Sequence, residues 1–504
     1  MATPSLRDQI RDALAVIEQL RADSTVLLAH NEQLRAQNEE LLADNASLRD
    51  RVAHLESEQK KDSTTSSKPP STDAIATRQS RAQRRAEARE ANRRQGKQPG
   101  APGTNLARRT PDVVVGHRPV CCEGCGAELS GASVIGEIRR QVIDLPAVTP
   151  TVTDHVAYRC RCRCGTETTA EFPPAATAPV CWGPQVRAFA LYLLDRQHLP
   201  VERTAELLAD VLGAPVSTGW LCQVQLEAAG KLAPFITELK NRLGAEAVVH
   251  ADETGTQVRT TKHWVHTLTT NLLTLLVVHP RRGVEALNDI GVLGAYTGTI
   301  VHDGWASYEL FDDAAHAQCG AHLLRHLNDV GQTAAYTAWT TQMTVVLLDA
   351  KTASEHAAAA GAGTVDPKTA RALCRRYHRT LDLAFSQLPD GPPPRRRHRG
   401  TWSIYERKAW NLATRMRNHA DQVLRLLDDT RVSFDNNTAE RALRMVKLHD
   451  KISGCFHSLT GAQAFATTRS YLQTAANHDE NLLDVLQQLF TTGPWLPPNP
   501  APVT

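Results

Sequence analysis

Three carboxylates stand where neighbouring elements of a fold could bring them together. Asp252 ends the apolar stretch "AVVHAD", and Asp303 ends the apolar stretch "GTIVHD". Glu440 lies in "DNNTAERALRMVKLHDK", just inside an expected helix. Carboxylates at the ends of adjacent strands converge at one sheet edge, and these hard oxygen ligands suit Mg²⁺ or Mn²⁺. Two such ions about 4 Å apart can activate an attacking oxygen and stabilise a leaving one in phosphoryl transfer.

Each acid also has a purely structural interpretation. Asp252 and Asp303 could be ordinary turn residues at strand ends. Glu440 could complete a capping box in which Asn437 is the N-cap. Two further acids stand beside these positions in the chain and are alternative ligands: Glu253 and Asp435.

The helix expected after Glu440 favours the metal-site interpretation. Cations follow it on the same helical face: Arg444, Lys447 and Lys451. A carboxylate followed by a cationic stripe suits a metal ligand beside a track of DNA phosphates. The alternative is a solvated helix face.

Six of the eleven cysteines cluster within residues 121–164. Without a secretion signal, such a cluster favours metal ligands over disulfides. Cys122 and Cys125 form a C-x2-C pair, and "YRCRCRCG" supplies a second, tighter pair. Two pairs at this separation are typical of a structural tetrahedral zinc site. We predict four ligands, with Cys160 as an alternative to Cys162: Cys122, Cys125, Cys162 and Cys164.

The acids need a sheet to position them, and residues 245–310 supply four strand patterns: "AEAVVHADE", "HWVHTLTT", "LLTLLVVHP" and "GTIVHDGW". The third is continuously apolar, which predicts a central buried strand. A helix is expected over "GVEALNDIGVL", between the third and fourth strands. Helical patterns then cover 319–430, interrupted at "LPDGPPPRRRHRG", and resume over 436–490.

Upstream of the strands, residues 184–243 have a helical period. The stretch "RTAELLADVLGAPVSTGWLCQVQ" predicts a helix, a glycine-containing turn, Ser217 as an N-cap and a second helix. This arrangement is that of a helix-turn-helix, which could contact DNA, although such helix pairs are also common in plain α-domains.

The N-terminal segment carries a heptad repeat over residues 6–58. Position d holds six leucines: Leu20, Leu27, Leu34, Leu41, Leu48 and Leu55. Position a holds three consecutive asparagines: Asn31, Asn38 and Asn45. Leucine at d with asparagine at a favours a parallel two-stranded coiled coil. The alternative is one amphipathic helix packed on the body of the protein.

A basic segment follows the heptads. Residues 78–109 hold ten basic and two acidic side chains, whereas residues 1–60 hold seven basic and eleven acidic ones. Such a block predicts a polyanion partner, and a solvated linker is the alternative. The residues that we expect to contact DNA phosphates are Arg84, Arg85, Arg93 and Arg94.

Composition excludes several classes of protein. The chain has 504 residues, of which 41% are hydrophobic and 22% charged, so wholesale disorder is not expected. The longest strongly apolar run, residues 272–278, is too short to cross a bilayer. The N-terminus is charged from Arg7 onward and has no signal-peptide core. We therefore expect a cytoplasmic protein with no membrane partner.

With these motifs in order, the chain resembles transposases of the insertion-sequence-sixty-six family over nearly its whole length. The resemblance includes the leucine heptads, "SSKPPS" and "GKQPGAPG" before the cysteines. It continues through "HADET", "VHDGW" and "CGAHLLR". The most specific part is C-terminal: "NNTAERALRMVKLHDKISGCF" and "GAQAFATTRSYLQTA".

The resemblance implies a ribonuclease-H-like catalytic domain with a DDE triad, which falls on Asp252, Asp303 and Glu440. Similar transposases use two divalent ions, Mg²⁺ or Mn²⁺, to hydrolyse the transposon end. The freed 3′-hydroxyl then attacks target DNA without a covalent intermediate. A zinc-binding module is also implied, although here the second cysteine pair is tighter than in the commonest pattern.

The prediction is therefore a multidomain α+β DNA transposase. Its expected parts are a coiled coil (1–60), a basic linker (61–111), a small β-rich zinc module (112–175), a helical region (176–244) and a catalytic domain (245–495) with a helical insertion at about 330–430. Expected partners are transposon ends, target DNA, a second copy of the chain and small accessory proteins; in a bacterium it would be nucleoid-associated. The alternatives are a DNA-binding repressor without catalysis and a metal-dependent nuclease of the same fold.

Overall fold

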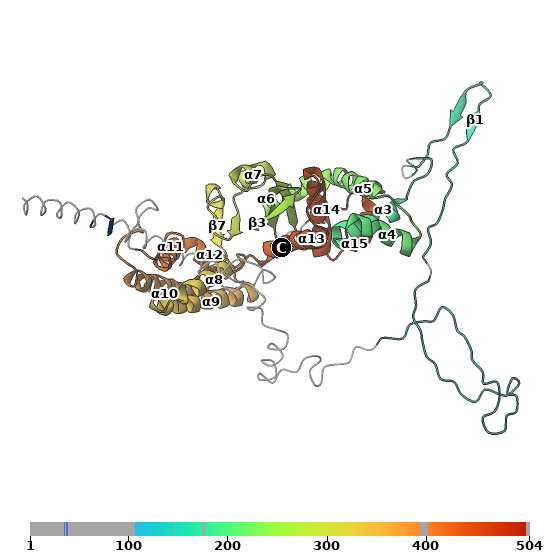
Figure 1. The fold of residues 1–504 in the computed structure, drawn as a ribbon, viewed down its shortest axis with the longest axis horizontal. Helices are drawn as coiled ribbons and strands as arrows, with labels where there is room; N and C mark the ends of the chain where they lie inside the picture. The colour runs from blue at the N-terminus through green and yellow to red at the C-terminus, as the bar shows by residue number, and fades with distance from the viewer. Residues whose placement is uncertain are drawn as a thin grey trace, which may run out of the picture.

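The computed structural model describes residues 106–146, 148–173, 176, 178–393 and 402–499, together with three single residues near the N-terminus. Nearly all of the expected coiled coil and most of the basic linker lie outside the described residues, as do Arg84, Arg85, Arg93 and Arg94. The described part is a mixed α/β fold, in which helices surround a five-stranded sheet (Figure 1).

The sheet combines an antiparallel and a parallel half. Its strands are β3 (Val248–Val258), β4 (Thr261–Thr269), β5 (Thr274–His279), β6 (Thr299–His302) and β7 (Ala315–Gln318). The spatial order is β5-β4-β3-β6-β7, so β3 is the central strand. The strands β3, β4 and β5 form an antiparallel meander, whereas β6 and β7 run parallel to β3. The four expected strands are confirmed.

The prediction that the apolar third strand is central was wrong, because β5 is an edge strand. Its outer N–H groups are nevertheless satisfied. The amide of Leu276 donates to Ser470 Oγ at 2.8 Å, and that of Thr274 donates to Thr474 Oγ1 at 3.1 Å. Helix α14 (Leu459–Asn477) thus covers this edge. An edge strand that a helix covers is as well shielded from solvent as a central strand, which explains why the sequence of β5 is continuously apolar.

The other edge strand, β7, was not expected from the sequence. It has only four residues, "AHAQ", and three of them are buried. Such a short segment lacks both the β-branched residues and the length that identify a strand. Its parallel pairing with β6 alone defines it.

Two helical layers cover the sheet. On one face, Val249 and Ala251 share a core with Phe235 and Tyr471. On the other, Val265 and its neighbours pack against α13 (Asn437–Ile452) and α14. The remaining elements around the sheet are α6 (Ala233–Ala245), α7 (Val284–Ile290), η3 (Leu293–Ala295), η4 (Tyr308–Leu310) and α15 (Leu482–Leu489). Because side chains alternate along a strand, His250 and Asp252 face the α13 side.

The helix pair expected upstream of the sheet is confirmed. It consists of α4 (Val201–Leu212) and α5 (Thr218–Lys231), preceded by α3 (Pro184–Leu191) and a π-helical turn, η2 (Tyr192–Arg196). Gly213 ends α4 with a φ of 59°, and the Ser217 hydroxyl accepts a hydrogen bond from the Trp220 amide as the N-cap of α5. The buried side of α5 packs on α3 and α14.

A helical insertion separates β7 from α13. Its elements are α8 (Gly320–Gly331), η5 (Ala334–Tyr336), α9 (Thr337–Ala359), α10 (Pro367–Ser386), α11 (Ile404–Asn418) and α12 (Ala420–Asp428). These helices have a core of their own around Trp339, which is fully buried. Figure 1 shows the insertion on one side of the sheet, with α3, α4 and α5 on the other.

The cysteine-rich region is largely irregular. Its described residues form one two-stranded hairpin, β1 (Arg159–Arg161) and β2 (Glu167–Thr169), which Figure 1 shows at the tip of an extended arm.

Among the described residues, no helix is long and apolar enough to cross a membrane.

A buried histidine, His198, and a half-buried one, His449, join the upstream helices to α13. The His198 ring lies 6.0 Å from that of His449, which stacks on Phe456 at 4.4 Å. Burial lowers the pKa of His198 to about 3, with Arg469, His449 and Arg196 adding repulsion, and lowers the pKa of His449 to about 4. Both values lie below that of an unfolded histidine, about 6.5. Protons therefore bind preferentially to the unfolded chain, and stability falls as the pH drops from about 6.5 towards 4.

We expect His449→Phe to reduce this acid sensitivity, because phenylalanine keeps the stacking and cannot be protonated. The loss of melting temperature between pH 7 and pH 5 should be about 2–4 °C smaller than in the wild type. Thermal unfolding monitored by circular dichroism measures it, with His457→Gln, at an exposed histidine nearby, as the control. An equal loss in His449→Phe and wild type would contradict the role assigned to His449.

Candidate active site

The first two acids are positioned by two neighbouring parallel strands, β3 and β6. The register of β3 and β6 pairs Val248 with Thr299 and His250 with Val301. Continued by two residues, the same register places Asp252 level with Asp303. Residues at the same level of adjacent parallel strands point to the same face. The two carboxylates therefore face the same side of the sheet at the point where β6 ends.

Asp303 does follow the last residue of β6, as expected, but Asp252 does not end its strand. β3 continues to Val258, because it remains paired with β4 after its pairing with β6 has stopped. Asp252 thus lies within β3, at a level where β6 has already ended and only β4 is still paired with β3. The turn after Asp303 is tight: its carboxylate accepts the Trp305 amide at 2.9 Å, and Gly304 has a φ of 87°.

The third acid, Glu440, comes from the first turn of α13, which packs on β3 and β4. The capping-box interpretation was wrong. α13 begins at Asn437 with Asn436 as the N-cap, and no side chain caps it at that residue. The Asn437 amide is bound instead by the Asp435 carboxylate at 3.0 Å. Asp435 therefore has a local structural role, and Glu440 is left for other contacts.

Asn436 is the residue that ties this helix to the sheet. It is fully buried. Its Nδ2 donates to the Ala251 carbonyl at 2.8 Å, and its Oδ1 lies 2.9 Å from His250 Nδ1. Its amide donates to Cys319 Sγ at 3.2 Å, and its carbonyl accepts the Glu440 amide at 3.1 Å. One side chain thus fixes the start of α13 beside the residue that precedes Asp252.

A close approach of backbones completes this junction. The amide of Gly320, at the start of α8, donates to the Phe434 carbonyl at 2.7 Å. A Cβ atom at position 320 would lie 2.3–2.7 Å from atoms of the Phe434 ring. Only glycine leaves room for this contact. The glycine of "CGAHLLR" is therefore explained by the loop that leads into α13.

The pKa of Asp252 reflects both its burial and the other acids near it. The pKa of Asp252 is raised well above its ordinary value, first by burial and then by repulsion from Glu253, Asp303 and Glu440. Burial also raises the pKa of Glu253. Among the described residues no ion pair offsets the charge of Asp252 or Asp303, and a bound cation would relieve the repulsion between them.

Glu253, the alternative to Asp252, is fully engaged elsewhere. Its side chain is 1% exposed and accepts two hydrogen bonds from Arg282, at 2.6 and 2.9 Å, and one from the Tyr308 hydroxyl at 2.7 Å. The Arg282 guanidinium lies between the rings of Trp264 and Trp305, 4.9 and 4.3 Å from their centroids. This set of contacts favours Asp252 as the acid that remains available.

Cationic side chains from the insertion border the acids. Arg325 of α8 donates to Glu440 at 3.0 Å, and His322 Nδ1 lies 3.9 Å from the same carboxylate. Arg415 of α11 binds His326 at 2.8 Å, and attraction to Asp303 partly offsets the burial that lowers its pKa. The place of these side chains beside the acids was not predicted. Arg325 lies within "CGAHLLR", which supported the family resemblance, whereas no local pattern distinguishes Arg415.

The cations predicted along α13 have mixed surroundings. Arg444 is 65% exposed and lies 3.4 Å from Glu440. The Lys447 ammonium contacts the Gly255 carbonyl and lies 3.6 Å from Asp450. Lys451 is exposed. The helix therefore presents Arg444 and Lys451 outward, while Lys447 also binds the β3 backbone.

The described residues do not contain a group of three or more His, Cys, Asp or Glu side chains already arranged to hold a metal ion. The three acids are close enough to affect one another electrostatically, yet Glu440 is directed at Arg325 and Arg444. Their carboxylate oxygens match in kind what Mg²⁺ or Mn²⁺ requires. The donor set fits these ions, whereas the described geometry is not a preformed cage.

The predicted zinc ligands form two separate turns. In the first, the Cys122 carbonyl accepts the Gly126 amide at 2.9 Å, and hydrogen bonds from Cys125 and Gly124 lower the pKa of the Cys122 thiol. In the second, hydrogen bonds from Thr166 and then Cys162 lower the pKa of the Cys164 thiol to about 7.

Lowered thiol pKa values favour the thiolate, which is the form that binds zinc. Cys160 lies in β1, whereas the backbone of Cys162 takes part in the turn that holds Cys164, with its carbonyl accepting the Gly165 amide at 2.9 Å. The described structure does not bring the two turns into one four-thiol group, so the ligand set stays a prediction.

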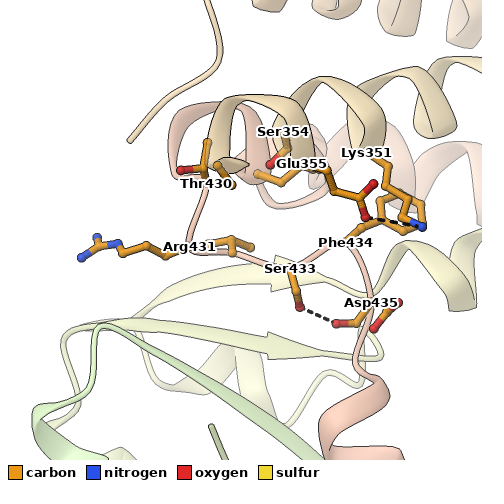
Figure 2. Close-up of a pocket in the computed structure, with 11 residues that line it drawn as sticks. Lys351, Ser354, Glu355, Thr430, Arg431, Ser433, Phe434 and Asp435 are labelled. Carbon is orange, nitrogen blue, oxygen red and sulfur yellow. Dashed lines mark hydrogen bonds and ion pairs between the residues drawn. The ribbon is translucent and has the colours of Figure 1, made fainter. Parts of the chain in front are cut away.

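A cavity of about 230 Å³ lies between α9 and the loop before α13, and none of the three acids lines it. Figure 2 shows Lys351 and Glu355 of α9 on one side and the loop with Ser433 and Asp435 on the other. The Ser433 hydroxyl donates to the Asp435 carbonyl at 2.6 Å. The cavity thus borders the loop that carries Asn436, but it is separate from the acids.

Comparison with known families finds matches to three parts of the chain. The family model described as "Transposase IS66 family" matches residues 179–464, which is more than half of the chain. That of the zinc-finger binding domain of transposase IS66 matches residues 119–165 and supports a structural zinc. A family of unknown function matches residues 1–107. A search of curated proteins finds no match. Together, the first two matches and the order of the motifs show that the chain belongs to the IS66 family of transposases.

Proposed function

We propose that this protein binds the terminal inverted repeats of an insertion sequence and catalyses metal-dependent DNA cleavage and strand transfer. The proposal rests mainly on one observation: the β3–β6 register places Asp252 level with Asp303, the residue after β6, and Glu440 of α13 is near enough to act on Asp252 electrostatically. Membership of a transposase family supports the same reaction. The catalytic residues that we assign are these three acids.

The strand order supports a ribonuclease-H-like catalytic domain. A central strand carries the first acid, an antiparallel meander lies on one side of it and two parallel strands lie on the other. The helical insertion enters between the last strand and the helix that carries the third acid. It contributes Arg325 and Arg415 next to the acids.

We assign the two divalent ions to Asp252, Asp303 and Glu440. When bound, such ions would activate the attacking oxygen and stabilise the leaving oxygen of an in-line displacement. The chain itself would position the phosphate. Arg325 and Arg415 stand where guanidinium groups could bind non-bridging phosphate oxygens. If Arg325 released Glu440 and bound a DNA phosphate instead, the Glu440 carboxylate would become available. No covalent intermediate with the protein is needed.

The N-terminal half would supply DNA binding and assembly. We assign dimerisation to the coiled coil of residues 1–60, because pairing two transposon ends requires at least two protomers. The basic linker, with Arg84, Arg85, Arg93 and Arg94, would contact the phosphate backbone. The zinc module and the α4–α5 pair would contact the terminal repeat.

The proposal is tested by strand transfer in vitro. Purified full-length protein is incubated with Mg²⁺, a supercoiled target plasmid and labelled duplexes carrying the ends of its own element, with an EDTA sample as control. We expect joined products with Mg²⁺ and none with EDTA. Cleavage without joining, also after the element's accessory proteins are added, would favour a nuclease. Sequence-specific binding without chemistry would favour a repressor.

The zinc module makes a separate prediction. Purified protein should contain about one equivalent of zinc, and Cys125→Ser and Cys164→Ser should each reduce it below half, because a site with three thiolates binds zinc more weakly. Cys222→Ser, at an exposed cysteine in α5, is the control. Metal analysis by mass spectrometry gives the content. Full zinc content in both variants would rule out the assigned ligands.

A further inference from the structure

The exposed face of α10 carries an unusual row of cations. Its members follow one another at intervals of three or four residues: Lys368, Arg371, Arg375 and Arg379. At 100° per residue, these positions fall within a narrow sector of the helix. All four side chains are exposed. We call this set the α10 basic face; it extends over about 16 Å of helix.

The two acids of this segment, Asp366 and Asp382, contact groups other than the α10 basic face. Asp366 caps the helix by accepting the Thr369 amide at 2.9 Å, and Arg371 acts on it only through a weaker electrostatic attraction. Asp382 lies 3.1 Å from Arg417 of α11. As far as the described residues go, no member of the α10 basic face has an acidic side chain within 4.0 Å of its charged nitrogens.

Cations on other helices often have an acidic partner. On several of them a cation is paired with an acid one helical turn away, as in Glu238–Arg242, Glu285–Arg281, Glu355–Lys351 and Asp421–Arg425. On α10, the residues one turn from Arg375 are Arg371 and Arg379. Like charges at this spacing repel one another and weaken a helix. Such an arrangement is costly unless an anion outside the chain neutralises it.

The position of α10 indicates which anion this is. Figure 1 shows α10 at the outer side of the insertion, packed on α9, with the sheet between it and the helices α4 and α5. If the zinc module and the α4–α5 pair hold the terminal repeat, a duplex that continues past the acids reaches the insertion. That continuation is the DNA flanking the transposon end.

We propose that the α10 basic face binds the phosphate backbone of the DNA that flanks the transposon end. This inference rests on the proposed function. Four cations in a row of this length match successive phosphates of one strand, which carries a charge every 3.4 Å along the axis. Contacts to phosphates carry no sequence information, which suits flanking DNA because its sequence differs at every insertion site.

The test uses the full-length chain with two matched variants. Arg375→Gln/Arg379→Gln removes two cations of the α10 basic face. Arg281→Gln/Arg431→Gln removes two exposed cations that are paired with Glu285 and Asp429. The two variants have the same net charge. Fluorescence anisotropy measures binding to a 30-bp duplex of arbitrary sequence between 50 and 200 mM salt, and to element-end duplexes with and without 20 bp of flank.

We expect Arg375→Gln/Arg379→Gln to reduce the slope of log K against log salt by about 2, whereas the control changes it by much less. The wild type should bind the flanked end about tenfold more tightly than the flush end, and the variant should lose this preference. Its melting temperature should not fall, because two like charges have been removed from α10.

Two results would overturn the inference. One is an equal slope in the α10 variant and the wild type, and the other is an equal preference for the flanked end. If the variant keeps that preference but loses joining to the target plasmid, the face binds target DNA instead. Metal-dependent cleavage by the wild type, measured in the same samples, tests the proposed function separately.

Discussion

Replacing Asp252 by asparagine should abolish DNA chemistry and, in the absence of divalent ions, make the protein more stable. We expect strand transfer to fall by roughly a thousandfold or more, because an amide cannot replace a carboxylate as a ligand of two cations. The pKa of Asp252 is raised by burial, Glu253 and Asp303, so its ionised form is unfavourable in the folded chain. Removing that charge should raise the melting temperature at pH 8 by about 2–4 °C.

Strand-transfer assays and thermal unfolding of the same samples measure both effects, and affinity for end DNA without metal should not fall. Glu253→Gln is the matched control at the next residue. It should keep strand transfer within about tenfold of the wild type while lowering the melting temperature, because it weakens the buried pair with Arg282. The opposite pattern, with Glu253→Gln inactive and Asp252→Asn active, would assign the metal to Glu253.

Asn436→Ala should damage stability and catalysis together. The substitution leaves the Ala251 carbonyl and the His250 ring nitrogen buried without a partner. We expect the free energy of unfolding to fall by about 2–4 kcal/mol. Because the same contacts set the position of Glu440 relative to Asp252, we also expect strand transfer to fall by about a hundredfold at a temperature where the variant is fully folded.

Asn437→Ala is the matched control, because Asn437 is the next residue and only its backbone amide has an assigned contact. It should change the free energy of unfolding by less than about 1 kcal/mol. Chemical denaturation gives the stability and single-turnover strand transfer gives the rate. A folded Asn436→Ala variant with wild-type rates would show that Asn436 stabilises the fold without positioning the acids.

Much of the sheet could be predicted because its strands bury one or both faces. Apolar runs such as "AVVHAD" and "GTIVHD" place the two aspartates next to the strand core, and this local pattern suffices to identify them. The position of β5 at the edge could not be predicted, since the hydroxyls that replace its missing neighbour come from Ser470 and Thr474, almost 200 residues away.

The surroundings of the acids were harder to predict than the acids. Asn436 looked like part of an ordinary helix start, whereas its contacts are with β3 and Cys319. Arg415 reaches the site only because the insertion folds back onto the turn after Asp303, and a helical period does not encode that packing. Pairwise contacts between distant segments decide these roles, and a single sequence does not display them.

The two edges of the sheet have a consequence for assembly. One edge is closed by the hydroxyls of Ser470 and Thr474, and at the other Arg425 donates to the His316 carbonyl of β7 at 2.7 Å. Exposed edges are where separate molecules join their sheets, as in domain-swapped dimers and fibrils. With both edges occupied by side chains of the same molecule, copies of this domain that meet at high local concentration resist fusing into a shared sheet. If the proposed assembly on DNA forms, its protomers can therefore separate again after strand transfer.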